Sequence, residues 1–152
     1  MAYVMAFSYD SRPIQTLLNQ IRNINKRDGI DLQPDYQRGY IWSSDFKDKL
    51  LYSIIKCYPI GNISLRVRTE KNQKGAMQEV VDGQQRLTTV YKFIENEYVI
   101  QSEISKDIIR YIVEYMDGDS DEKLLKLKRK LGNKGKVSIS FRQLPQAIQD
   151  NI

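Results

Sequence analysis

Residues 80–89 read Val80-Val81-Asp82-Gly83-Gln84-Gln85-Arg86-Leu87-Thr88-Thr89, and this stretch passes from a predicted strand into a predicted helix. The two valines end a predicted strand that begins at Met77, and a glycine follows them after a single aspartate. Leu87 is the first of a series of apolar residues at helical spacing, in a helix that we expect to end near Tyr98. A strand that passes directly into a helix through glycine indicates a domain in which helices and strands pack together.

The start of that predicted helix has the chemistry of an anion site. Its first backbone N–H groups are unpaired and lie at the positive end of the helix dipole, which favours phosphate. Gly83 allows a ligand to approach the backbone closely, and Arg86 offers a two-pronged, always-charged contact. Asp82 has the carboxylate needed to hold a divalent cation or to position a water molecule. A purely structural alternative also fits, because Asp82 and Gln85 have the spacing of a capping box.

A second polar loop lies upstream, at residues 33–42, where glutamine and arginine stand between aromatic residues. Arg38 is suited to phosphate, and Tyr36 or Tyr40 to stacking on a base. The alternative is a hydrophobic loop in which Tyr36 and Trp42 pack into the core while Arg38 stays solvated. We assign Trp42 to packing in either case.

The remaining pattern predicts one α+β domain over residues 1–152. A helix is expected over 13–26, and a second helix begins at a cap formed by Ser43 or Ser44. Alternation over 63–68 predicts a strand that pairs with a returning strand over 77–81. Further on we expect a helix over 104–116, a strand over 137–141 and a helix over 144–152. The residues expected to point inward from the second helix and its following strand are Phe46, Leu50, Leu51, Ile54, Ile55, Ile63, Leu65 and Val67.

Composition narrows the possible functions. The chain has no histidine, which excludes a Ser-His-Asp triad, a Cys-His pair and any histidine general base. Its single cysteine, Cys57, cannot form an internal disulfide, and we expect it to be a small buried residue. No apolar run is long enough to cross a membrane, so we expect a cytoplasmic protein. The formal net charge of +5 favours an anionic partner.

The two loops together carry a specific resemblance. The chain holds Pro34-x-Tyr36-Gln37-Arg38-x-Tyr40-x-Trp42, then Tyr58-Pro59-Ile60-Gly61, then Val81 through Thr89. Their order and spacing over about residues 14–97 resemble the N-terminal domain of GmrSD-type modification-dependent restriction enzymes, which the phage-defence protein SspE shares.

The resemblance implies a ParB/sulfiredoxin-like fold, with a small mixed sheet and several flanking helices. It also implies nucleoside triphosphate binding and hydrolysis, coupled to DNA restriction. The family's nucleotide-linked motif corresponds to residues 82–86, and residues 36–38 are implied to face the same pocket. The phosphate loop has no cysteine, so the resemblance gives no support to a sulfiredoxin reaction.

The chain departs from the family pattern in two ways. Family members usually continue into a nuclease domain of the His-Asn-His type, which a chain without histidine cannot contain. We therefore expect an excised domain or a natural short member. A later Asn-Gly-Gly-type segment is also missing, so the pocket is either incomplete or completed by a partner chain.

Our first hypothesis is a nucleoside triphosphate-binding domain with GTP, UTP or CTP and Mg²⁺ as cofactors, and with hydrolysis as a further possibility. Backbone N–H groups of residues 83–85 would hold the β- and γ-phosphates, Arg86 and Arg38 would clamp them, and Asp82 would hold the metal or orient water. Gln37 and Gln84 would place the water or recognise the ligand. The expected nucleotide-binding residues are Tyr36, Gln37, Arg38, Gly83, Gln85, Arg86 and Thr88, and the expected catalytic residues are Asp82, Gln84 and Arg86.

Two other hypotheses stay open. The chain is alternatively a non-enzymatic DNA- or protein-binding module, which includes a short decoy or inhibitor form. Its DNA contacts would come from the basic stretch 123–136, with Lys128, Arg129 and Lys130 as the expected residues. The third hypothesis is a metal-dependent nicking nuclease that uses Asp82, Asp35 and Glu79. Expected partners are a nucleotide, DNA, a nuclease subunit or domain and a second copy of the chain, without a membrane.

Overall fold

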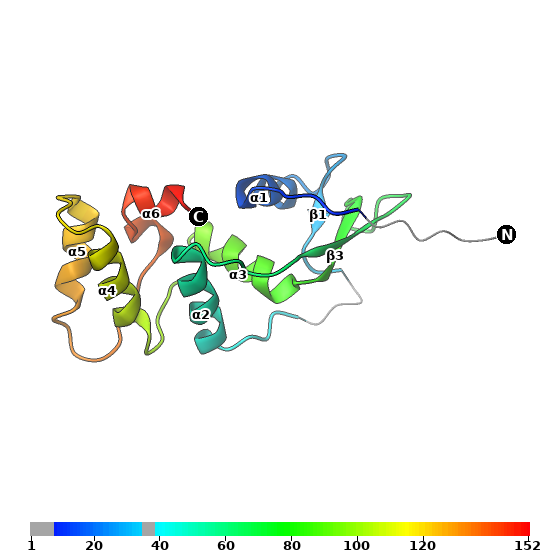
Figure 1. Cartoon of the computed structure of the whole chain (residues 1–152). Coiled ribbons are helices and arrows are strands. Elements are labelled where there is room, and N and C mark those ends of the chain that lie inside the picture. Colours follow the sequence, from blue (N-terminus) through cyan, green and yellow to red (C-terminus); the bar gives the residue numbers. More distant parts are fainter. Residues whose placement is uncertain (1–7, 35–38) are drawn as a thin grey trace.

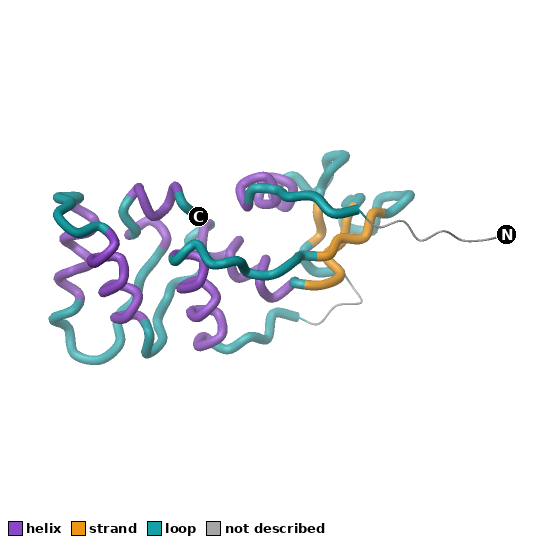
Figure 2. Tube along the Cα trace, viewed as in Figure 1, coloured by secondary structure: helices purple, strands orange, loops and turns teal. Residues whose placement is uncertain are grey.

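The structure, a computed structural model, describes residues 8–34 and 39–152 of the chain. A small sheet lies toward the N-terminal end of the molecule and a group of helices lies at the other end (Figures 1 and 2). No helix of the described ranges is long and apolar enough to span a membrane. The elements are α1 (Ile14–Arg22), β1 (Ile30–Asp31), α2 (Ser44–Ile55), β2 (Ser64–Val67), β3 (Gln78–Asp82), α3 (Gln84–Ile94), α4 (Ser105–Tyr115), α5 (Glu122–Lys130), a 3-10 helix η1 (Phe141–Gln143) and α6 (Gln146–Asp150).

The sheet is mixed, and β3 is its central strand. β1 pairs with β3 in parallel and β2 pairs with β3 antiparallel, which gives the order β1-β3-β2. This arrangement confirms the predicted α+β class with a small mixed sheet and flanking helices. The ParB/sulfiredoxin-like assignment stays a prediction.

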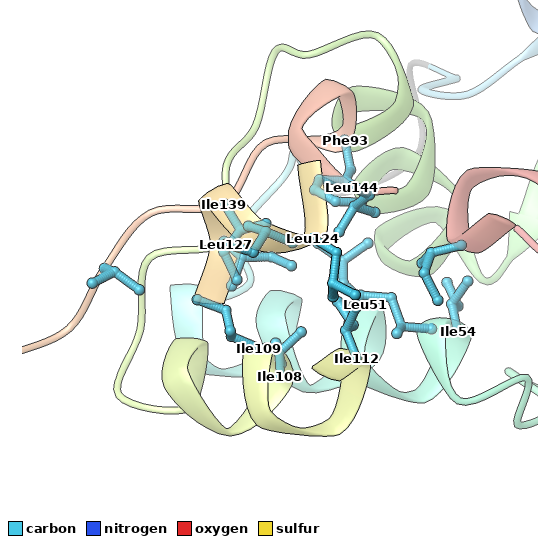
Figure 3. Close-up of a cluster of buried hydrophobic side chains, with 14 of the residues drawn as sticks. Leu51, Ile54, Phe93, Ile108, Ile109, Ile112, Leu124, Leu127, Ile139 and Leu144 are labelled. Atoms are coloured by element: carbon cyan, nitrogen blue, oxygen red, sulfur yellow. The ribbon is translucent and has the colours of Figure 1, made fainter. Parts of the chain in front are cut away.

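Most of the buried apolar surface lies in the helical part of the molecule. Side chains from α2, α3, α4, α5 and α6 form one continuous cluster (Figure 3). Five apolar residues of this cluster have no exposed surface at all and come from α4 and the segments after it: Ile108, Ile109, Ile112, Ile139 and Leu144. Burial on this scale is the main stabilising contribution of a domain of this size.

The sheet has a much smaller apolar core, which consists of Ile30, Val80 and Leu87 with partly buried neighbours. Leu87 belongs to α3, whose next turns bury Val90 and Phe93 in the larger helical cluster. A single helix therefore joins the two cores. The first turn of α3 is therefore held in position by packing against the sheet and against the other helices.

Hydrogen-bonded carboxylates supplement the small core. Asp31 and Glu79 are directly paired in the β1–β3 register, and both are nearly fully buried. The Asn72 amide donates to both, at 3.0 and 3.1 Å. Arg68 forms an ion pair with Glu79 at 3.2 Å, and Lys74 forms one with Asp31 at 3.4 Å. This network fixes the β2–β3 loop against β1.

A second buried carboxylate, Asp48 of α2, has no exposed surface. The Tyr98 hydroxyl donates to it at 2.6 Å, and the backbone N–H groups of Gln101 and Ser102 donate at 3.0 and 2.7 Å. Burial, together with the hydrogen bond to Asp48, raises the pKa of Tyr98 far above its ordinary value. Asp48 thus fastens the turn between α3 and α4 onto α2.

Several sequence predictions were wrong at the edges of elements. The first helix spans Ile14–Arg22 rather than 13–26, and Pro13 is its N-cap instead of its first helical residue. The predicted strand over 137–141 is only an isolated bridge between Ile139 and Ile100, and a 3-10 helix begins at Phe141. The alternation there reflects burial of Val137 and Ile139 beneath helices, without a neighbouring strand to extend the pairing.

Three residues that we expected to be buried lie at the surface. Val67 is 73% exposed, because the small sheet core does not extend to the end of β2. Phe46 is 62% exposed and contacts the Trp42 ring instead of the core. Cys57 is exposed and has a left-handed backbone, since the chain turns away there just after α2 ends at Ile55.

We predict that Asp48→Asn destabilises the fold by about 2 kcal/mol or more, because charge-assisted hydrogen bonds are lost and an amide nitrogen faces N–H donors. Urea unfolding followed by circular dichroism measures the change. Tyr98→Phe is the control: it removes one donor of three and should cost less than Asp48→Asn. Equal stability of Asp48→Asn and wild type would contradict the assigned role of this carboxylate.

We predict that Glu79→Gln destabilises the protein by about 1–3 kcal/mol at pH 7. Burial opposes ionisation of Glu79, but hydrogen bonds from Asn72 and Arg68 outweigh it and lower its pKa. The stabilisation is therefore present above the pKa of an unfolded glutamate, about 4.3, and is lost as the pH falls through the lower folded value. Urea unfolding across this range should show the difference from wild type shrinking in acid. The exposed Glu70→Gln is the control, and a difference that does not change with pH would refute the prediction.

Candidate functional site

The β3–α3 junction is the centre of the candidate site. Gly83 is the N-cap of α3 and has a left-handed backbone, with φ 89° and ψ 15°. A side chain is disfavoured there by conformation and by space, because an added Cβ would lie 2.4 Å from the Ile63 Cδ1 atom. No side chain caps the helix. Because the first-turn N–H groups have no partner within the helix, they are available to an anion.

The capping-box alternative for Asp82 and Gln85 is not formed. Asp82 is the last residue of β3, and its side chain is 73% exposed. Its Oδ2 atom lies 3.6 Å from the Arg86 Nη2 atom. The carboxylate is therefore at the surface beside the guanidinium, where a cation or water could reach it.

Arg86 is held in place by the loop between α2 and β2. Its Nη1 atom donates to the Ile60 carbonyl at 2.7 Å. Gly61 also has a left-handed backbone, and a Cβ there would lie 2.5 Å from the same Nη1 atom. The guanidinium thus fits against two glycines, Gly61 and Gly83, with 21% of the side chain exposed. A guanidinium has five N–H donors, and the Ile60 bond uses one of them.

The Gln85 side chain connects the two sequence motifs. Its Nε2 atom donates to the Gly39 carbonyl at 2.9 Å. Its Oε1 atom accepts from the backbone N–H groups of Ile41 and Trp42, at 3.1 and 3.2 Å. The predicted binding residues Tyr36, Gln37 and Arg38 lie outside the described residues, as does Asp35. The segment that directly follows them is fastened to the first turn of α3.

Gln84 and Thr88 have a different environment from Gln85. They are four residues apart on α3, so they share one face of the helix, and they are only 7% and 8% exposed. Their burial leaves little surface for a ligand to contact. The structure therefore brings Asp82, Gly83 and Arg86 together at the surface, while it encloses Gln84 and Thr88.

The carboxylates proposed for metal-dependent nicking do not converge in the described part of the chain. Glu79 is enclosed by Asn72 and Arg68, whereas Asp82 is exposed at the other end of β3. Among the described residues, no group of three or more histidine, cysteine or acidic side chains could hold a metal ion.

The basic residues proposed for DNA binding lie on α5, at the far end of the molecule from β3 (Figure 1). Lys128 and Arg129 are exposed. Lys130 already has hydrogen-bond partners within the protein, because its ammonium donates to the Ser138 carbonyl and to the Gln143 side chain. Burial lowers the pKa of Lys130.

Sequence reasoning missed the role of Tyr40 and the two lysines beside it. The Tyr40 hydroxyl hydrogen-bonds to the Thr89 hydroxyl at 2.8 Å, and Thr89 donates to the Gln85 carbonyl. The Lys47 and Lys92 ammonium groups lie near the Tyr40 ring. The signal was the i, i+4 spacing of Gln85 and Thr89, which puts both on one face of α3, toward the aromatic loop.

A comparison with known families gives an independent result. The sequence model described as the GmrSD restriction endonuclease, N-terminal domain, matches residues 14–152. No curated protein and no solved structure gives a significant match. The family match covers most of the chain and includes both motifs that meet at Gln85. The protein therefore belongs to the family of GmrSD restriction endonuclease N-terminal domains.

Proposed function

We propose that the β3–α3 junction binds the phosphates of a nucleoside triphosphate, and that this domain regulates a restriction system through that binding. The uncapped first turn of α3 behind the left-handed Gly83 is the observation that carries the proposal. Three consecutive N–H groups at the positive end of a helix dipole favour a phosphate group. The glycine removes the side chain that would otherwise block the approach.

Arg86 supplies the positive charge for this site. The Ile60 carbonyl and the two glycines hold its guanidinium in one orientation, so little side-chain entropy remains to be lost when a phosphate binds. The guanidinium keeps donors that the Ile60 bond does not use. Arg38 and Gln37 are proposed as further contacts, because Gln85 fastens the residues that follow them to the same helix turn.

Asp82 is the proposed ligand for Mg²⁺. Its carboxylate is exposed and lies on the same side as the guanidinium, at 3.6 Å from Nη2. Mg²⁺ is commonly held by one or two carboxylates together with the substrate phosphates and several waters. A single aspartate beside a phosphate site satisfies that requirement. Hydrolysis is the second step of the proposal, in which Asp82 would hold the metal or orient the attacking water.

The proposed role in restriction follows from family membership. The family name describes an N-terminal domain of a restriction endonuclease, so the domain is a module of a restriction system. Binding or hydrolysis of a nucleotide at such a module would control the activity of a nuclease domain or subunit. The hydrogen bond between Arg86 and the Ile60 carbonyl offers a route for this coupling. Any movement of Arg86 toward a phosphate would pull on the α2–β2 loop through this bond.

We predict that Arg86→Ala weakens binding of the preferred nucleotide by about 10- to 100-fold, because charge-assisted hydrogen bonds are typically worth about 1.5–3 kcal/mol. Isothermal titration of the wild type with GTP, UTP, CTP and ATP in the presence of Mg²⁺ identifies that nucleotide. Arg86→Lys keeps the charge but loses the two-pronged geometry, so its nucleotide affinity should lie between those of the wild type and Arg86→Ala.

Arg68→Ala is the matched control for this experiment. Arg68 is a similarly half-buried arginine, 32% exposed, whose partner is Glu79 at the opposite end of β3. It should keep the wild-type nucleotide affinity. No binding by the wild type, or equal losses in Arg68→Ala and Arg86→Ala at equal folded fractions, would contradict a phosphate site at the junction.

We predict that Asp82→Asn retains nucleotide binding without metal but loses the gain in affinity that Mg²⁺ provides, because it removes the proposed metal ligand. Titration of the nucleotide with and without Mg²⁺, together with phosphate release over time, measures both effects. The exposed Asp10→Asn serves as a charge-matched control. A Mg²⁺ effect that survives in Asp82→Asn would assign the metal to other groups.

A further inference from the structure

Two lysines from different helices converge on one aromatic ring. The Lys47 Nζ atom, from α2, lies 3.9 Å from the centroid of the Tyr40 ring. The Lys92 Nζ atom, from α3, lies 4.7 Å from the same centroid. Each distance is within the range of a cation–π contact, so the negative face of the ring attracts both ammonium groups.

The ring that both lysines contact is held in place. The Tyr40 hydroxyl is bonded to Thr89, and the backbone on both sides of Tyr40 is bonded to the Gln85 side chain. These contacts come from the motif that also forms the β3–α3 junction. The lysine pair is therefore a fixed feature of this surface, in contrast to lysines that extend freely into solvent.

The cluster carries two positive charges, and the charge of the nearby Asp48 offsets part of that of Lys47. Neither ammonium group forms an ion pair with a carboxylate in residues 8–34 or 39–152. The nearby carboxylate of Asp48 is fully buried and accepts three other donors. Burial, and then the charge of Lys92, lower the pKa of Lys47. An anion between the two lysines would relieve this repulsion.

We propose that Lys47 and Lys92 together bind a backbone phosphate of DNA. Both side chains are partly exposed and can be reached from solvent. Lysine binds phosphates as a point charge and needs no base contact, which suits sequence-independent binding to a nucleic-acid backbone. The family is named for a restriction endonuclease, and the substrate of such an enzyme is DNA.

This site is separate from the β3–α3 junction. Lys92 lies eight residues beyond Gln84 on α3, which corresponds to a rise of about 12 Å. One phosphate group cannot contact both positions, whereas a DNA strand presents several phosphates in succession. The proposal does not depend on nucleotide binding at Arg86.

Fluorescence anisotropy with a labelled DNA duplex, measured at several salt concentrations, tests the proposal. The double variant Lys47→Gln, Lys92→Gln should bind more weakly, and its slope of log affinity against log salt should decrease in magnitude by about 0.9, the contribution of the one phosphate contact that is lost. Lys47→Arg, Lys92→Arg keeps both charges and should keep most of the slope.

The matched control removes the same two charges elsewhere. Lys26→Gln, Lys49→Gln changes two exposed lysines, one of them on α2 two residues beyond Lys47 and therefore on a different face of the helix. It should retain the wild-type slope. The variant Lys128→Gln, Arg129→Gln tests α5 in the same way and should also retain it.

Four outcomes would overturn the proposal. They are no DNA binding by the wild type, an equal loss of slope in the Lys26, Lys49 control, a loss confined to the α5 variant, and a Lys47, Lys92 variant that keeps DNA binding but loses nucleotide affinity. The last result would assign the two lysines to the nucleotide. Unfolding midpoints of all variants, measured in parallel, separate these results from loss of the fold.

Discussion

The passage from β3 to α3 through the left-handed Gly83 sets the arrangement of the sheet and the helices. β3 is the central strand, and α3 contributes to both apolar cores. The chain turns from one into the other without a linker because residue 83 adopts a left-handed backbone that glycine tolerates. The direction of α3, and with it the position of the helical half relative to the sheet, follows from that one residue.

The same turn of α3 organises the loops around it. Gln85 holds the aromatic loop by its backbone, and Arg86 holds the α2–β2 loop through Ile60. Two residues that look like ligand contacts in the sequence are thus also fastenings between segments far apart in the chain. This double use explains why the motif contains Gln85 and Arg86, which exceed what a helix cap requires.

Sequence reasoning reached the α+β class, the order of the principal elements and the junction, because local periodicity and one glycine determine these features. It failed where contacts between elements distant in the sequence determine whether a side chain is buried. Val67 alternates correctly but lies beyond the edge of a small core, and Phe46 has helical spacing but packs on Trp42 at the surface. Val137 and Ile139 alternate because helices cover them. The Lys47–Tyr40–Lys92 cluster joins residues that are 45 positions apart, which no local pattern reveals.

The unequal size of the two cores has a thermodynamic consequence. The sheet half buries few apolar side chains and relies on the Asp31–Asn72–Glu79 network and on bonds to backbone carbonyls. Exposure of apolar surface raises the heat capacity on unfolding, whereas exposure of polar surface lowers it. Opening of the sheet half therefore has a small heat-capacity change, and its free energy depends little on temperature. The helical half has the larger heat-capacity change, so the curvature of the free energy of unfolding with temperature comes mainly from it. The two halves of one domain therefore differ in how strongly their stability depends on temperature.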